Sequence, residues 1–173
     1  MSKRAEVMAE LAAGAKTLGN RDLVGVDLSG LDLMAMDLSR MDLRGANLRR
    51  ARLIDSSLVG ADLREANLSE ADMLRADLRH CDARKAVFRG AVVKQVDFFG
   101  ANLMGSDFTD ADLEGAALPL SCDGFRDVQH SSRAIFGLFA LFLEARIADD
   151  EDQAAIRSAL KALAARTSYL FRR

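Results

Sequence analysis

Few residues of this chain could act as nucleophiles, bases or metal ligands, because it holds only two histidines and two cysteines. His80 and His130 have no serine, cysteine or carboxylate beside them at a spacing that acid–base or nucleophilic catalysts use. Cys81 and Cys122 make no disulfide framework, so we expect two reduced thiols in a cytoplasmic protein. No glycine cluster matches a phosphate-binding loop or a nucleotide fingerprint. The sequence therefore predicts no catalytic residue, no metal site and no cofactor, and an enzyme is not expected.

Charged side chains form the second chemically active group. Arg44, Arg64 and Arg84 are spaced twenty residues apart, and each follows an aspartate by two positions, as in Asp62-Leu63-Arg64. If residues twenty apart lie in one column, these arginines form a charged contact column for an anion or a partner. The alternative is a solvated ladder in which each arginine pairs with an aspartate of the next column. The sequence leaves both interpretations open.

The element that positions these residues has a period of five. From Leu23 to Leu118 every fifth residue is Leu, Met, Phe or Val, with Ala83 as the exception. On a helix, five residues advance about 500°, so successive apolar residues would form no stripe. On a flat strand, an odd step sends them to alternate faces, and a one-sided core is lost. A chain that turns a corner after every five residues keeps each central residue inside, and its coils can stack as a solenoid.

The repeated unit reads Ala-(Asp/Asn)-Leu-x-x, as in residues 46–50, 61–65 and 111–115. Over residues 22–118 the chain resembles the pentapeptide-repeat family, with no insertion. The resemblance implies an all-β solenoid core, a right-handed quadrilateral β-helix of about five coils. The central residue and the small residue two before it would point inward. Two groups depart from the pattern, four large residues at the small inward position of the first coil and two valines at the polar position: Val26, Leu31, Met36 and Met41, and Val87 and Val92.

Helical patterns flank the solenoid, which we place at residues 21–120. Residues 2–18 are amphipathic, and residues 1–20 are predicted to form an N-terminal capping helix that covers apolar surface and open strand edges. Residues 121–173 are predicted to form a C-terminal helical hairpin, with one strongly apolar helix from about Asp127 to Ala148 and a second that begins at Asp150.

An apolar strip on the third face of the solenoid is a candidate protein interface. Met34, Ile54 and Leu74 stack at an outward position, and Val92 adds a neighbouring apolar group. A contiguous outward apolar strip is typical of an interface. The chain's own C-terminal helices or a second molecule could cover it. The fourth face carries a smaller apolar pair, Val59 and Phe99.

The apolar C-terminal helix is the second candidate interface. Its side chains, among them Phe136, Phe139 and Phe142, cover most of its circumference, more than one cap and one neighbour can bury. We therefore expect a homodimer through this helix. Attachment of the same phenylalanines to a membrane surface is the rival interpretation, with only a thin flanking basic belt to support it.

Charge tests whether the rod could imitate DNA, as members similar to the quinolone-resistance group do when they bind type II topoisomerases. Residues 22–118 carry 17 acidic and 12 basic side chains, a net charge of −5. Duplex DNA carries one negative charge per ~1.7 Å, so a rod of ~24 Å would need about fourteen uncompensated charges. The solenoid falls short of that. Nucleic acid is not expected as a partner either, because no basic face with interleaved aromatic residues is present.

Together these features predict a non-enzymatic, cytoplasmic interaction or scaffold module of bacterial type, which binds protein and self-associates through its C-terminal helices. Two alternatives stay open: a DNA mimic that binds gyrase, and a peripheral membrane adaptor.

Overall fold

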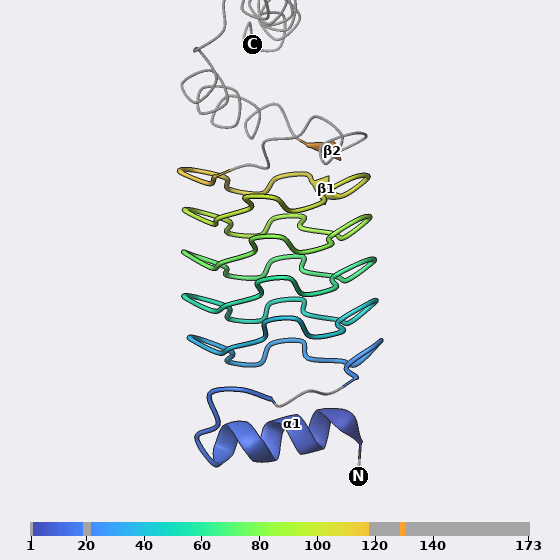
Figure 1. The fold of residues 1–173 in the computed structure, drawn as a ribbon, viewed down its shortest axis with the longest axis vertical. Coiled ribbons are helices and arrows are strands. Elements are labelled where there is room, and N and C mark those ends of the chain that lie inside the picture. Colours follow the sequence, from blue (N-terminus) through green and yellow to red (C-terminus); the bar gives the residue numbers. More distant parts are fainter. Residues whose placement is uncertain (1, 19–21, 118–128, 131–173) are drawn as a thin grey trace, which may run out of the picture. The chain divides into compact units, whose positions relative to one another are not determined.

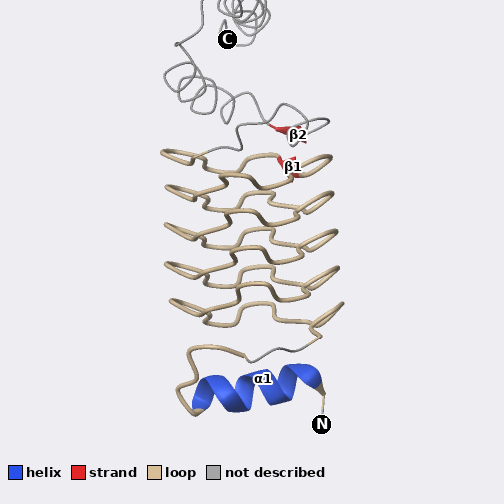
Figure 2. Ribbon diagram, in the orientation of Figure 1, coloured by secondary structure: helices blue, strands red, loops and turns tan. Residues whose placement is uncertain are grey.

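The computed structural model describes residues 2–18, 22–117 and 129–130. The chain divides into two compact units, Met1–Leu138 and Phe139–Arg173, and every described residue belongs to the first. The elements are α1 (Lys3–Ala12), β1 (Asp107–Phe108) and β2 (Gln129–His130). Most of the remaining described chain is a stack of turns and bridges (Figures 1 and 2). The helices predicted within residues 131–173 lie outside the described residues.

Helix α1 is shorter than the sequence pattern predicts. Ser2 caps its N-terminus, because Ser2 Oγ accepts a hydrogen bond from the Ala5 N–H at 3.2 Å. The helix ends at Ala12, and Gly14 follows with a φ of 80°, a conformation that glycine adopts without steric cost. The prediction of a helix to Leu18 is therefore wrong in its last third.

Residues 16–18 belong to the solenoid instead. Thr17 forms a parallel bridge with Asp37, and the Asp37 N–H donates to the Lys16 C=O at 2.8 Å. Leu18 is fully buried. It stands twenty residues before Leu38 and five before Leu23, so it continues the inward pattern back by one position. Side chains of this short rung cover part of the N-terminal end of the stack.

The coils stack with a strict step of twenty residues, as the period of five predicts. Parallel bridges join position n to position n + 20 from Asp22 to Ala117. Within one step, the Leu43 N–H donates to the Asp62 C=O at 2.9 Å, and the Asp62 N–H donates to the Met41 C=O at 2.9 Å. Each coil thus has four sides of five residues, and it pairs through its backbone with the coils before and after it (Figure 1). The predicted solenoid core is confirmed.

Where the polar position of the repeat holds Asp or Asn, its side chain builds the corner. Asp62 Oδ1 accepts the Arg64 N–H at 3.2 Å, which is an Asx turn, and the same contact recurs along the stack. The corner residue that follows has a positive φ, such as 60° at Glu65. Val87 and Val92 cannot accept this hydrogen bond, yet both keep their bridges to the neighbouring coils. Backbone pairing therefore preserves the register where the Asx turn is missing.

The interior is filled by the central residues and by the small residues two positions before them. The four large residues that replace alanine in the first coil are also buried, at 3–9% exposure: Val26, Leu31, Met36 and Met41. Near Ala83, three phenylalanine rings pack together. Phe88 stacks on Phe108 with centroids 4.4 Å apart, and Phe98 meets both rings edge-on. Aromatic volume thus occupies the layer in which alanine replaces the larger central residue.

At the other end of the stack, β1 pairs with β2 in parallel. Asp107 is opposite Gln129 and Phe108 is opposite His130, a step of 22 residues in place of 20. The solenoid pairing therefore continues beyond residue 120, the boundary predicted from sequence. The helix predicted from about Asp127 is wrong at Gln129 and His130, because both residues are in a strand.

Candidate interaction surfaces

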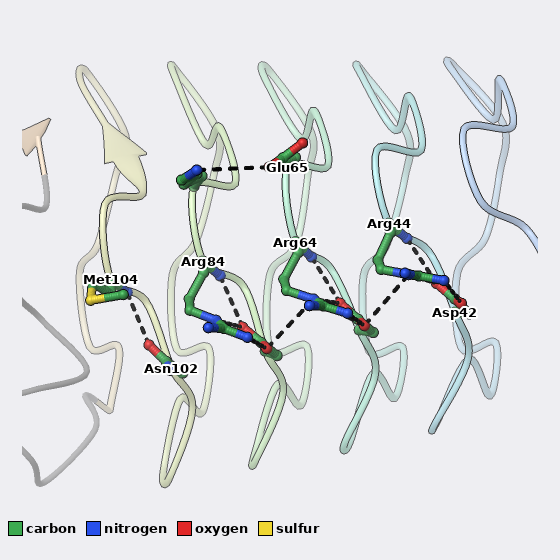
Figure 3. Close-up of polar contacts among 10 residues, drawn as sticks. Asp42, Arg44, Arg64, Glu65, Arg84, Asn102 and Met104 are labelled. Carbon is green, nitrogen blue, oxygen red and sulfur yellow. Dashed lines mark hydrogen bonds and ion pairs between the residues drawn. The ribbon is translucent and has the colours of Figure 1, made fainter.

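The first face carries an ion-pair ladder from Asp42 to Arg84, which Figure 3 shows. Arg44 Nη2 lies 2.7 Å from Asp42 Oδ2 of its own coil, and Arg44 Nε lies 3.7 Å from Asp62 Oδ2 of the next coil. The same alternation continues with Arg64, which contacts Asp62 at 2.6 Å and Asp82 at 3.7 Å. The ladder ends with Arg84, paired to Asp82 at 2.7 Å.

These pairs have two hydrogen bonds each in the plane of the guanidinium. Arg64 Nε and Nη2 both donate to the Asp62 carboxylate. The hydrogen bonds from Arg64 hold the pKa of Asp62 below its usual value of 3.8, although partial burial opposes this. The hydrogen bonds from Arg44 lower the pKa of Asp42 in the same way. The structure therefore places the three predicted arginines in one column, but their charges are matched by carboxylates within the face.

The third face has a different outward column. Met34 is 41% exposed, and Ile54 and Leu74 follow it at intermediate exposure. Val92 lies in the adjacent column, where it bridges Asp72 and Asp112 through its backbone. The column then becomes charged at Lys94, which pairs with Glu114 at 2.8 Å. The predicted strip is thus one outward patch over the first three coils. Its proposed counterparts Phe136, Phe139 and Phe142 lie outside the described residues.

A groove at the N-terminal end of this strip was not predicted from the sequence. It has a volume of about 450 Å³. Three of its nine lining residues are methionines, and the lining comes from α1, the turn after it and the first coil: Met8, Leu11, Gly14, Ala15, Lys16, Leu31, Asp32, Met34 and Met36. The groove depends on the turn at Gly14, and the sequence pattern predicted that the helix would continue through this residue. The sequence contains methionines at positions 8 and 34, but their spacing did not predict that both line one groove.

The fourth face presents a small aromatic cluster. His80 and Phe99 meet edge-to-face with ring centroids 5.6 Å apart, and Phe99 is 46% exposed. The nearest coil corner, Gly100, could not carry a side chain without moving His80, because an added Cβ would lie 2.4 Å from His80 Nδ1. His80 is thus packed against an aromatic ring and not against a nucleophile.

No constellation suited to catalysis or to metal binding occurs within residues 2–18, 22–117 and 129–130. No three histidine, cysteine or acidic side chains gather to hold a metal ion in that part of the chain. Burial raises the pKa of the Cys81 thiol to about 12, so the thiol is protonated and unreactive at neutral pH. Each buried polar side chain of the described residues has a hydrogen-bond partner. Among the same residues, no helix has the length and apolar character needed to cross a bilayer.

Comparison with known proteins agrees with the repeat geometry. The model of the pentapeptide-repeat family matches eight copies, over residues 17–50, 46–82 and 84–118. No curated protein matches the chain.

Three solved structures illustrate the likeness. A pentapeptide repeat protein from the Arabidopsis thaliana thylakoid lumen is 30% identical over 59% of this chain and 72% of its own, with a TM-score of 0.28. Rfr23 from the cyanobacterium Cyanothece 51142 is 21% identical over 72% and 93%, with a TM-score of 0.29. QnrB1, a plasmid-mediated fluoroquinolone resistance protein, is 20% identical over 78% and 94%, with a TM-score of 0.35.

The family match covers more than half of the residues and begins at Thr17, the position where the first bridge of the stack forms. The backbone step of twenty, the Asx-turn corners and the buried central residues are the physical basis of that match. The chain belongs to the pentapeptide-repeat family.

Proposed function

We propose that the protein is a non-enzymatic interaction module whose third-face strip, formed by Met34, Ile54, Leu74 and Val92, binds a protein partner. The observation that supports this is the contrast between outward columns: the arginines of the first face pair with carboxylates, whereas the strip presents an exposed Met34 and the half-buried Ile54 and Leu74. Exposed contiguous apolar surface on a folded protein is costly unless a partner covers it. A flat, rigid solenoid face also loses little conformational entropy on binding.

A pull-down from the native host tests this function. The full chain serves as bait beside three variants, Met34→Asp, Ile54→Asp and Leu74→Asp. Each places a carboxylate in the strip without touching the buried columns. We expect the specific partners of the wild type to be lost from at least the Ile54 and Leu74 variants. A matched control is Met104→Asp on the first face, where a similarly exposed methionine ends the arginine column. Retention of the same partners by all three strip variants would refute the role of this face.

We also propose that two copies associate through the apolar segment within residues 131–147, which lies outside the described residues. Its composition supports this. Light scattering of the full chain would give a dimer mass, and substitution of Phe136, Phe139 and Phe142 by serine would give a monomer mass. A monomer mass for the wild type at high micromolar concentration would contradict self-association, whereas recruitment of the wild type to liposomes would favour the membrane-adaptor alternative.

A cytoplasmic location is proposed on the strength of the buried, free Cys81 thiol.

Imitation of DNA remains the alternative, and the ladder of the first face argues against it. A DNA mimic needs uncompensated negative charge, whereas Asp42, Asp62 and Asp82 each lie within ion-pair distance of an arginine. We therefore expect no change in a gyrase supercoiling assay when the protein is added. Inhibition or protection in that assay would favour the alternative.

A further inference from the structure

We propose that the N-terminal edge of the third face binds an extended peptide of a partner protein, which adds a strand beside residues 31–34 and fills the methionine-lined groove. This inference rests on the proposed function, because it specifies how a partner engages the N-terminal end of the strip. The occupant has three features: a free backbone edge, an apolar side chain, and a carboxylate. Each follows from a different observation.

The backbone of the first coil is paired on two of its other faces. On the second face, Arg4 substitutes for a missing strand, since Arg4 Nη1 and Nη2 donate to the Asp27 and Ser29 C=O groups at 2.8 and 3.0 Å. On the fourth face, the Asp37 N–H donates to the Lys16 C=O. At the N-terminal end of the stack, α1 and residues 16–18 thus take the places that a preceding coil would fill on these two faces.

The third face has no such substitute. Within the described residues, the Asp32 N–H and the Asp32 and Met34 C=O groups have no hydrogen-bond partner, although the equivalent groups of the next coil are paired. There the Arg52 N–H donates to the Leu31 C=O at 2.9 Å, and the Arg52 and Ile54 C=O groups accept from the Leu33 and Ala35 N–H groups at 2.8 and 2.9 Å. An added strand would repeat this pattern, with one C=O group and two N–H groups placed two residues apart. Open edges of this kind are the sites at which extended peptides bind by strand addition.

The groove lies along this open edge. Leu31, Asp32 and Met34 of the first coil line it, together with Met8 and Leu11 of α1. Its volume of about 450 Å³ falls within the ~300–1,000 Å³ of binding pockets. Methionine side chains are unbranched and polarizable, so they can pack around apolar side chains of different shapes. An apolar side chain of the added strand would enter here.

Charge at the groove selects an acidic peptide. The Asp32 carboxylate is already engaged, because Oδ2 lies 2.7 Å from Arg52 Nη1 and Oδ1 accepts the Met34 N–H at 3.2 Å. The Lys16 ammonium has no ion-pair partner among the described residues, and Lys16 lines the same groove. A carboxylate on the peptide would pair with Lys16. A chain with an apolar and an acidic residue in extended conformation is therefore the partner that this edge fits.

The test selects peptides directly. A phage-displayed library of random decapeptides is screened against the full-length protein, and an enriched peptide is labelled with fluorescein and titrated by fluorescence anisotropy. We expect enrichment of sequences with an apolar and an acidic residue. We expect Met34→Asp and Lys16→Glu to weaken binding at least tenfold. Val24→Asp is the matched control, because Val24 is 40% exposed on the first face of the same coil and outside the groove. Its affinity should equal that of the wild type. Circular dichroism verifies that each variant is folded.

Strand addition has a signature that side-chain docking lacks. Methylation of single peptide nitrogens should abolish binding at two amides that are two residues apart and leave the amide between them without effect. Failure to enrich any peptide, or binding that is insensitive to methylation at every position, would overturn the inference. Self-association of the protein that Lys16→Glu abolishes would also overturn it, since the occupant would then be a second copy. Loss of host partners from Ile54→Asp and Leu74→Asp, with retention by Lys16→Glu, would refute the edge while leaving the proposed function intact.

Discussion

The first and third faces of the solenoid share one backbone but present different chemistry to a partner. Both have buried central leucines and the same twenty-residue step. They differ in the residue that follows the buried central residue, which is arginine at positions 44, 64 and 84 and apolar at positions 34, 54 and 74. On the first face this residue reaches back to the aspartate two positions before it, and the pair neutralises itself. At positions 34, 54 and 74 of the third face no such pairing is possible, so the same backbone offers an apolar surface there.

The difference shows that the repeat specifies a scaffold and leaves recognition to the variable outward positions of each side. A family match therefore predicts the inward residues well and the partner poorly. The consequences can be tested by perturbing what the two faces share and then what distinguishes them.

The largest effect is expected in the buried columns, which both faces share. Leu43→Ala on the first face and Leu53→Ala on the third face each remove a fully buried side chain. Each should lower the free energy of unfolding by about 2–5 kcal/mol, because the lost apolar contacts leave a cavity. Urea unfolding monitored by circular dichroism measures both. If one variant were nearly neutral, the two faces would not have equivalent cores.

An intermediate effect is expected at the N-terminal edge, where the second face is covered and the third is open. Arg4→Met removes the donors to the Asp27 and Ser29 C=O groups and should cost about 1–2 kcal/mol of unfolding free energy. Lys3→Met is the control, because Lys3 makes only an exposed ion pair with Asp22, and it should change stability much less. The same urea titration measures both variants. Equal costs would show that Arg4 does not substitute for a strand.

The smallest effect is expected from the ladder, and it depends on pH. Arg44 and Arg64 keep the pKa of Asp42 and Asp62 below 3.8 in the folded state. The stability that these ion pairs contribute is therefore fully present from about one pH unit above 3.8. It is lost as the pH falls through the lowered pKa values of the two aspartates in the folded state. The double variant Arg44→Met, Arg64→Met should melt at a lower temperature than the wild type near pH 6, and this difference should shrink below about pH 4.

Thermal melts by circular dichroism between pH 3 and pH 7 measure that difference. The control is a third-face double variant, Ile54→Thr and Leu74→Thr, whose offset in melting temperature should not vary with pH. A ladder offset that stays constant down to pH 3 would mean that the carboxylates contribute no pH-linked stability.

Most of the described fold could be predicted, because its contacts repeat. A period of five excludes helix and flat strand, and stacking then places Leu43 above Leu63 and Arg44 beside Asp62. The candidate column and strip follow from the same register. The sequence also held one signal that the helical pattern obscured: Leu18 lies five residues before Leu23, in phase with the repeat.

The ends of the stack could not be predicted in the same way. Contacts there join segments that share no period. Arg4 reaches the C=O groups of Asp27 and Ser29 across more than twenty residues. The strand at Gln129–His130 returns with a step of 22, which breaks the register. The methionine groove likewise arises only because α1 stops at Ala12 and the chain turns at Gly14.

The amino-acid sequence by itself determined the solenoid, its register and the residues on each face, because a repeated local pattern makes every long-range contact a copy of the last one. Only the tertiary structure decided which arginines are neutralised, how the first coil is covered, and where an edge with a groove stays open. Those outcomes depend on single side chains that meet across non-repeating segments, and their distances cannot be obtained from spacing along the chain.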